Sequence, residues 1–137
     1  MHPVAVMDKS HCPFCLPEAS RIRLENEVAV AFLDGFPVAE GHTLVVPRRH
    51  VASLFELSGP EQAAVWSMVA RVRARLLEEL HPDGFNVGLN DGPAAGQTVM
   101  HAHVHVIPRR KGDVADPRGG VRWIIPDRAA YWPGSRG

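Results

Sequence analysis

The sequence predicts an α+β fold in which an antiparallel sheet is covered by one long helix, with short helical segments in the connections. Short apolar, β-branched runs are separated by glycine and proline, and one segment near the middle has helical periodicity. The connections vary in length, which does not suit repeated βαβ units. With 137 residues, 45% of them hydrophobic, the chain fits a single domain over residues 1–137, in which 109–137 form a C-terminal extension.

Four segments are predicted to be strands. Residues 28–34 and 42–47 are β-branched and apolar and are separated by Gly35, Pro37 and Gly41, which predicts two strands joined by a loop. Residues 85–89 form a third strand, which leads into the glycine-rich loop 90–97. The fourth strand is predicted from about Thr98 to Ile107.

One long helix is predicted between the second and third strands. Ser58 and Glu61 have capping-box spacing, and Pro60 suits a first helical turn. Apolar residues then follow at three- and four-residue steps: Val65, Val69, Val72, Leu76 and Leu80. The helix should end near His81 and Pro82.

The charge balance and the hydropathy argue against two classes of partner. Fifteen basic residues offset fifteen acidic ones, so no net field attracts a polyanion, and we expect neither nucleic acid nor a membrane as a partner. No stretch approaches the roughly 20 apolar residues of a membrane helix. Residues 1–10 lack the pattern of a signal peptide. We therefore expect a cytoplasmic protein.

Three histidines alternate with apolar residues at positions 101, 103 and 105. In a strand this alternation places all three imidazoles on one face, with successive Cα atoms of the row roughly 6–7 Å apart. The row could be a chance feature of a half-exposed strand, a metal cluster or a catalytic row. Metal hydrolases usually need further ligands to complete an open site, and no acidic residue follows this strand before Asp113. The pattern therefore favours a catalytic row.

Two segments resemble the histidine triad (HIT) superfamily. Residues 96–107, GQTVMHAHVHVI, match its signature of three histidines alternating with apolar residues, and residues 41–50, GHTLVVPRRH, are similar to a second block of the family. The similarity runs in the same order from Cys12 to Pro108. It implies a HIT-like fold, and the tail resembles the bacterial branch of dinucleoside polyphosphate hydrolase-like proteins.

The resemblance implies chemistry on a nucleotide α-phosphate. His103, the middle histidine, would be the nucleophile that forms a covalent nucleotidyl-histidine, and a neutral imidazole suits this role near pH 7. His105 would contact the α-phosphate, and Gln97 and Thr98 would donate hydrogen bonds to phosphate oxygens. The expected substrates are conjugates of a nucleoside monophosphate, with a purine base favoured: dinucleoside polyphosphates or nucleoside phosphoramidates.

Two further residues are expected at the sugar. By resemblance, Asp34 would bind the ribose hydroxyls and Asn90 would contact the sugar-phosphate region. Both residue types are also common in turns and at strand ends, which is the competing interpretation. Two other functions stay open: a metal-dependent hydrolase with the histidine row as ligands, and a non-catalytic nucleotide sensor.

Cys12 and Cys15 have the spacing of a zinc knuckle, which needs two more ligands to close a structural site. His50 and His101 are the candidates, by resemblance to family members that pair these positions. We expect structural zinc and no catalytic metal. A redox pair and a surface pair without function are the alternatives, and His11 could replace one ligand.

The remaining histidines and the tail carry weaker signals. His2, His42 and His81 are interpreted as surface or packing residues. The apolar segment 118–126 either docks on the domain's own core or covers a partner through Trp123 and Ile124. The resemblance implies a homodimer whose two sheets join.

Overall fold

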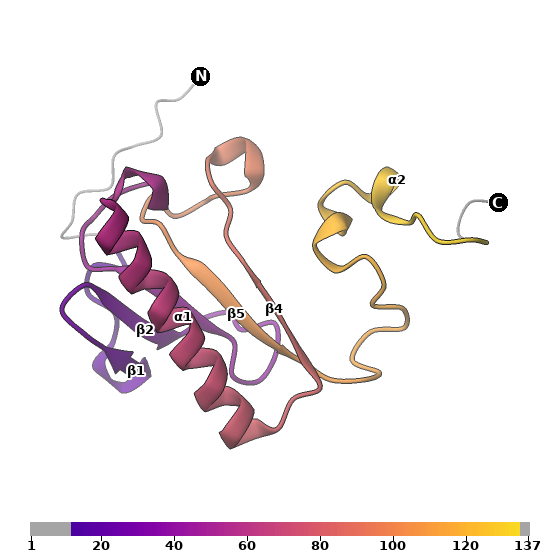
Figure 1. Ribbon diagram of the computed structural model, residues 1–137, viewed down its shortest axis with the longest axis horizontal. Helices are drawn as coiled ribbons and strands as arrows, with labels where there is room; N and C mark the ends of the chain where they lie inside the picture. Colours follow the sequence, from indigo (N-terminus) through magenta and orange to yellow (C-terminus); the bar gives the residue numbers. More distant parts are fainter. Residues whose placement is uncertain (1–11, 135–137) are drawn as a thin grey trace.

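The computed structural model describes residues 12–134 and contains one antiparallel sheet of order β1-β2-β3-β5-β4. The strands are β1 (Ile22–Glu25), β2 (Ala29–Leu33), β3 (Thr43–Pro47), β4 (Gly84–Gly88) and β5 (Val104–Arg109). The long helix α1 (Gly59–Leu80) crosses one face of the sheet (Figure 1). The remaining helical segments are short: η2 (Ala19–Arg21), η3 (Leu54–Glu56), η4 (Pro93–Ala95), η5 (Gly120–Ile124) and α2 (Pro126–Ala129). The predicted α+β class is confirmed.

The ends of α1 are set by local chemistry. The Ser58 hydroxyl accepts a hydrogen bond from the Glu61 amide at 3.2 Å, and the Ser58 amide donates to the Glu61 carboxylate at 3.1 Å, which completes the predicted capping box. At the other end His81 adopts a left-handed conformation (φ 49°), and Pro82 follows directly. The predicted limits of the helix are confirmed.

The two faces of the sheet have different coverings. On one face small and branched residues of the sheet, such as Ala31, Val45 and Val104, pack under the buried residues of α1. The other face carries a second cluster made by Val30, Phe32, Leu44 and Val46, against which Phe14 and Ile22 pack. Because strand residues alternate between faces, His105 lies on the face away from α1, opposite in orientation to Val104 and Val106.

Two strand predictions need correction. β1 was not predicted, although Ile22-Arg23-Leu24-Glu25 alternates half-buried and exposed residues; its four residues are too short for a strong signal. The last strand begins at Val104 rather than Thr98. The pairing of β5 with both neighbours stops there: Val104 is the last residue paired with β3, opposite Val45, and His105 is the last residue paired with β4, opposite Gly88. Upstream, the amide of Ala102 bonds instead to the carbonyl of Val51, which follows β3 in the sequence.

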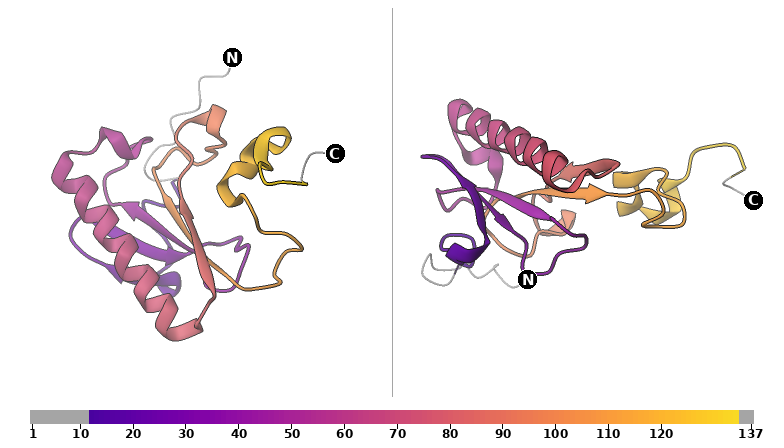
Figure 2. Two further views of the ribbon diagram at one scale, coloured as in Figure 1. Left: turned by 45° about the vertical axis from the view of Figure 1, so that its right-hand side comes forward. Right: turned by 90° about the horizontal axis from the view of Figure 1, so that it is seen from below.

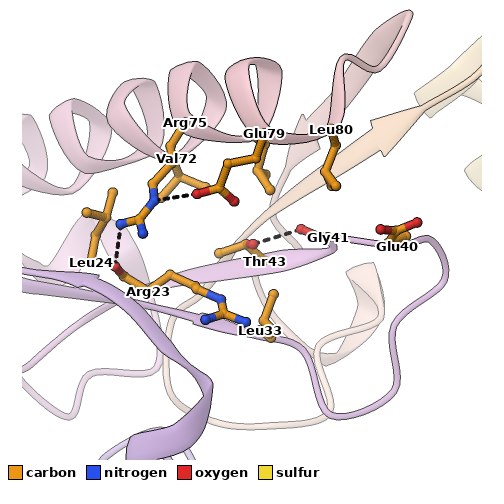
Figure 3. Close-up of a pocket in the computed structure, with 11 residues that line it drawn as sticks. Arg23, Leu24, Leu33, Glu40, Gly41, Thr43, Val72, Arg75, Glu79 and Leu80 are labelled. Carbon is orange, nitrogen blue, oxygen red and sulfur yellow. Dashed lines mark hydrogen bonds and ion pairs between the residues drawn. The ribbon is translucent and has the colours of Figure 1, made fainter.

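A cavity of about 190 Å³ lies between α1 and strands β1 to β3, on the α1 side of the sheet (Figure 3). Its polar rim includes Arg75, which binds Glu79 at 2.8 Å and the Arg23 carbonyl at 2.9 Å. Leu80 and Gly41 line the end of the cavity nearest the end of the helix. Gly41 has a φ of +85°, which favours glycine, and a Cβ atom there would lie 2.5 Å from Leu80 Cδ1, so a larger residue would strain the backbone and displace the leucine.

After Arg109 the chain leaves the sheet and forms an extension that stands apart from the sheet and α1 (Figures 1 and 2). The Arg109 side chain holds its start, bonding Asp113 at 2.7 and 2.8 Å and Asn86 at 2.6 Å. A groove of about 820 Å³ separates part of the extension from β4 and β5. Within residues 12–134, no helix is long and apolar enough to cross a membrane.

Candidate active site and metal centre

Four nitrogen and sulfur donors converge at one end of the sheet. The ligand atoms of Cys12, Cys15, His50 and His101 all lie within 4.8 Å of one another. Nδ1 of His101 is 3.4 Å from each cysteine Sγ and 3.3 Å from Nδ1 of His50, which in turn lies 3.2 Å from the Cys15 Sγ. The structure thus brings together the four residues predicted as metal ligands, while His11 lies outside the described residues.

The donor set fits a tetrahedral zinc ion. Bonds of about 2.0–2.3 Å from zinc to nitrogen and sulfur place neighbouring ligand atoms roughly 3.3–3.8 Å apart. His101 is oriented for ligation, because its Nε2 donates to the Pro47 carbonyl at 2.7 Å and this leaves the Nδ1 lone pair for the metal. Cys12 is buried and Cys15 is half-buried. They belong to a tight turn, in which the Cys15 amide bonds the Cys12 carbonyl at 3.3 Å.

His103 lies next to this cluster and is buried, with 8% of its surface exposed. Its Nδ1 donates to the carbonyl of His101 at 2.8 Å. A carbonyl can only accept, so the ring proton of neutral His103 is on Nδ1 and the Nε2 lone pair is free. Phe14, between the two cysteines, packs on His103 with ring centroids 4.9 Å apart.

A second polar cluster connects His105, His42 and Asp34. Nε2 of His42 lies 2.9 Å from Nδ1 of His105 and 3.4 Å from a carboxylate oxygen of Asp34. Burial, together with the neighbouring His103 and His42, lowers the pKa of His105 to about 4. Burial also lowers the pKa of His42, which outweighs the opposing effect of the Asp34 charge. Both imidazoles are therefore neutral near pH 7.

Asp34 occupies the position predicted for the ribose contact. Its Oδ1 accepts from the Phe36 amide at 2.7 Å, which closes a small turn at the end of β2. The loop from Asp34 to His42, together with Leu33, lines a pocket of about 420 Å³ beside this carboxylate. That volume falls within the range of small-molecule sites in proteins.

The loop 90–97 holds the other predicted polar residues. Gln97 is buried, and its Nε2 donates to the carbonyls of Ala52 and Val99 while its Oε1 accepts from the Gly92 amide. Both amide hydrogens of Gln97 are thus used within the protein, and the side chain braces the loop. Thr98 is exposed next to it, and Asn90 is half-buried beside Gly96.

Sequence reasoning missed two residues of the site. His42, interpreted as a surface or packing residue, is 3% exposed and contacts both Asp34 and His105. The sequence did contain a signal for the contact between His42 and Asp34. The two predicted strands form a hairpin in which Leu33 pairs with Thr43, so the residues next to this pair, Asp34 and His42, face each other across the hairpin. No role was assigned to Phe14, although it lies between two predicted zinc ligands. His81 is exposed, as predicted, and His2 lies outside the described residues.

Three features of the described residues together characterise this protein. They are a five-stranded antiparallel sheet, a row of alternating histidines that leads into the inner strand β5, and a cluster of two cysteines and two histidines beside that row. Residues 18–112 match the family model described as the HIT domain. The chain therefore belongs to the histidine triad family.

Relatives and solved structures agree with this assignment. An uncharacterised HIT-like protein of Mycoplasma genitalium is 44% identical over 62% of this chain and 60% of its own length. The asymmetrical bis(5'-nucleosyl)-tetraphosphatase of Schizosaccharomyces pombe is 35% identical over 73% of this chain and 55% of its own. The crystal structure of a zinc-bound histidine triad family protein from Mycobacterium smegmatis superimposes with a TM-score of 0.71, at 37% identity, over 80% of this chain and 82% of that one.

Proposed function

We propose that this protein is a nucleotide hydrolase or transferase that cleaves conjugates of a nucleoside monophosphate through a covalent intermediate on His103. The observation that carries the proposal is the hydrogen bond from His103 Nδ1 to the His101 carbonyl. It leaves the Nε2 lone pair available for attack, and the carbonyl can stabilise the positive charge that the ring gains on attack.

The chemistry would proceed in two steps. His103 Nε2 attacks the α-phosphorus, forming a P–N bond as the P–O or P–N bond to the leaving group breaks and that group departs with the bonding electrons. Water then attacks the nucleotidyl-histidine, the P–N bond to His103 breaks, and the nucleoside monophosphate is released; another acceptor in place of water would give transfer. His105 contacts the α-phosphate, Asp34 binds the ribose hydroxyls, and Asn90 contacts the sugar-phosphate region.

Within the loop 90–97 and its end, Thr98 would contact the phosphate directly, and Gln97 would act indirectly by holding the loop. Thr98 is exposed at its end and can donate its hydroxyl to a phosphate oxygen. The predicted phosphate contact of Gln97 would require it to give up a hydrogen bond to Ala52 or Val99. We therefore assign Gln97 the task of holding the loop in place.

Dinucleoside polyphosphates and nucleoside phosphoramidates with a purine base are the proposed substrates. The Schizosaccharomyces pombe relative carries the first class in its name, which supports that choice. The pocket beside Asp34 has room for a nucleoside next to the buried histidines. The leaving group would extend toward the solvent-exposed side of the site.

We also propose a structural zinc ion held by Cys12, Cys15, His50 and His101. When bound, zinc would cross-link segments that are distant in the sequence and would leave His103 and His105 for phosphate. The zinc-bound Mycobacterium smegmatis relative and the four converging donors support this proposal. Cysteine thiolates that bind a metal suit the reducing environment expected for a cytoplasmic protein.

We propose that two copies associate through the β4 side of the sheet. The β1 edge is short and exposes charged residues, Arg23 and Glu25, which discourage strand pairing. On β4, in contrast, Val87 is exposed and apolar, and Arg73 of α1 lies over Phe85 of the same strand. Trp66 and Leu77, which are also exposed, lie seven residues before and four residues after Arg73 and thus on the same side of α1. A partner covering this surface would bury apolar area and pair an open edge.

The covalent route is tested with His103→Ala. Because the substitution removes the attacking nitrogen and leaves Asp34 in place, turnover of an adenosine phosphoramidate should fall at least about a thousand-fold while AMP still binds. Rapid quenching of the wild type and peptide mass spectrometry should locate adenylate on His103. The exposed His81→Asn is the matched control and should retain activity. Adenylate on another residue, or full turnover by His103→Ala, would refute the route.

A further inference from the structure

The cavity between α1 and the sheet has apolar walls on both sides (Figure 3). Val72 and Leu76 of α1 are buried, and Leu24 of β1 and Leu33 of β2 are half-buried on the side of the sheet. The volume of about 190 Å³ exceeds the roughly 150 Å³ of an engineered apolar cavity that binds benzene. The space can therefore hold the hydrocarbon part of a small organic molecule.

The charges at the rim of this cavity are only partly paired. The Arg75 guanidinium is held by Glu79 and by the Arg23 carbonyl, which links α1 to β1. The Arg23 guanidinium makes no hydrogen bond or ion pair with any described residue, and it extends from β1 toward Leu33 (Figure 3). Glu40 lies at the end of the cavity away from β1. The rim thus offers a free cation beside apolar walls, with an anion at the other end.

The cavity shares a wall with the proposed nucleotide pocket. Leu33, Glu40 and Gly41 line both spaces. Next to them the chain alternates, because Thr43 lines the cavity whereas its neighbour His42 lines the other pocket. The Thr43 hydroxyl donates to the Gly41 carbonyl at 2.8 Å, which ties the end of the loop to β3. A change in packing on the cavity side therefore reaches the loop that forms the nucleotide pocket.

The shared wall also lies directly against α1. Gly41 approaches the helix so closely that a Cβ atom there would be 2.5 Å from Leu80 Cδ1 and 3.2 Å from Leu76 Cδ2. Both leucines line the cavity. Because packed side chains transmit strain, a ligand that fixes these leucines also restricts Gly41 and the loop that ends there.

We propose that the cavity is a binding site for a small organic carboxylate and that its occupancy strengthens nucleotide binding. The hydrocarbon part lies between Val72 and Leu24, and the carboxylate pairs with the Arg23 guanidinium. Repulsion from Glu40 disfavours the reverse orientation. The ligand orders the side chains beneath the loop, so that the nucleotide has less left to order. The effect on the nucleotide rests on the proposed function, whereas binding of the carboxylate does not.

Hexanoate is the probe for the site, added to the protein as purified and without nucleotide. The backbone amide NMR signals of Gly41, Thr43 and Val72 should shift and saturate, with a dissociation constant on the order of 1 mM for so small a ligand. Hexanol has the same chain without the charge and should bind on the order of threefold more weakly, as expected for the loss of one partly exposed ion pair.

Two arginine variants test the recognition of the carboxylate. Arg23→Gln should remove the preference for hexanoate over hexanol and leave the affinity for hexanol unchanged. Arg128→Gln, at an exposed position of α2 outside the cavity, is the matched control and should bind both molecules like the wild type. Signals that do not saturate, signals centred on residues outside the cavity, or an unchanged preference in Arg23→Gln would each overturn the site.

The effect on the nucleotide is measured with AMP. Saturating hexanoate should lower the dissociation constant of AMP about fivefold, and AMP should lower that of hexanoate by the same factor, because coupling between two sites is reciprocal. Val72→Phe fills the cavity and should abolish both effects, while Arg23→Gln decides the matter even if Val72→Phe fails to fold. An affinity for AMP that hexanoate leaves unchanged would overturn the coupling. Because hexanoate binding is measured without nucleotide, failure of the site is distinct from failure of the His103 route.

Discussion

Backbone groups decide which ring nitrogen is free in each histidine of the site. The Pro47 carbonyl takes the Nε2–H of His101, and the His101 carbonyl takes the Nδ1–H of His103. His101 therefore has two functions, since its side chain faces the cysteines and its backbone orients the proposed nucleophile. His101 and His103 therefore have opposite nitrogens free, although both belong to the same alternating row.

A single glycine controls the approach of the 35–41 loop to the helix. Gly41→Ala should destabilise the protein by about 2–4 kcal/mol, because alanine disfavours a positive φ and its Cβ would overlap Leu80. Chemical unfolding at equilibrium measures the loss. Since Gly41 precedes His42, the variant should also lose activity.

The control for Gly41 is Gly59→Ala at the start of α1. A Cβ atom at Gly59 would have no heavy atom within 4 Å, and alanine favours helices, so the free energy of unfolding should stay within about 1 kcal/mol of the wild type. A Gly41→Ala protein as stable as Gly59→Ala would show that the loop can move away from Leu80 at little cost.

At the scale of elements, the sheet separates packing from chemistry. The α1 face of the central strands is filled with small and branched residues, and the other face carries His105 and the apolar cluster beneath Phe14. The extension after Arg109 differs from these elements, because it exposes Val121, Ile124 and Ile125 while its polar groups bond mainly within itself. An exposed apolar segment of this kind indicates a binding surface.

Deletion of the extension from Arg118 onward tests that surface. If the segment around Trp123 packs near the active site of a partner copy, its loss should weaken the dimer and change the relative rates among adenylated substrates. The His103 adduct should still form, because β5 and the metal cluster precede the deletion. Light scattering measures the mass and a substrate panel measures the ranking. A truncated dimer with an unchanged ranking would show that the extension has no such role.

At the scale of the whole molecule, the four proposed zinc ligands come from three distant parts of the chain. Cys12 and His101 are 89 residues apart in sequence, and His50 belongs to the segment between β3 and α1. A metal bound there would close long loops and fix the start of β5 relative to the end of β3. The site and the fold would then be stabilised by the same ion.

Replacing both thiols, as Cys12→Ser with Cys15→Ser, tests this coupling. The wild type should contain about one zinc per chain, and the double variant should lose it together with roughly 10 °C or more of its thermal midpoint. Elemental analysis and calorimetry measure the two effects. A zinc content unaffected by the substitutions would refute the assignment, and a reversible Cys12–Cys15 disulfide in a zinc-free wild type would favour the redox alternative.

The sequence by itself determined the elements whose signals are local. The capping box at Ser58, the helical period of α1 and the alternation around His105 depend only on neighbouring residues, and each is found in the structure. The Cys12–Cys15 spacing and the resemblance to the family also pointed to the four donors that the fold brings together. These features follow from backbone geometry, which repeats over a few residues.

Only the tertiary structure decided the partners of each side chain. His42 joins the site because antiparallel pairing brings it beside Asp34 and His105, and Gln97 turns inward because Ala52 and Val99 offer carbonyls to it. The start of β5 depends on where its pairing with β3 and β4 stops, and the proton on His101 depends on the Pro47 carbonyl, which is 54 residues away in the sequence. Hydrogen bonds between segments distant in sequence leave no periodic pattern, so these assignments required the folded protein.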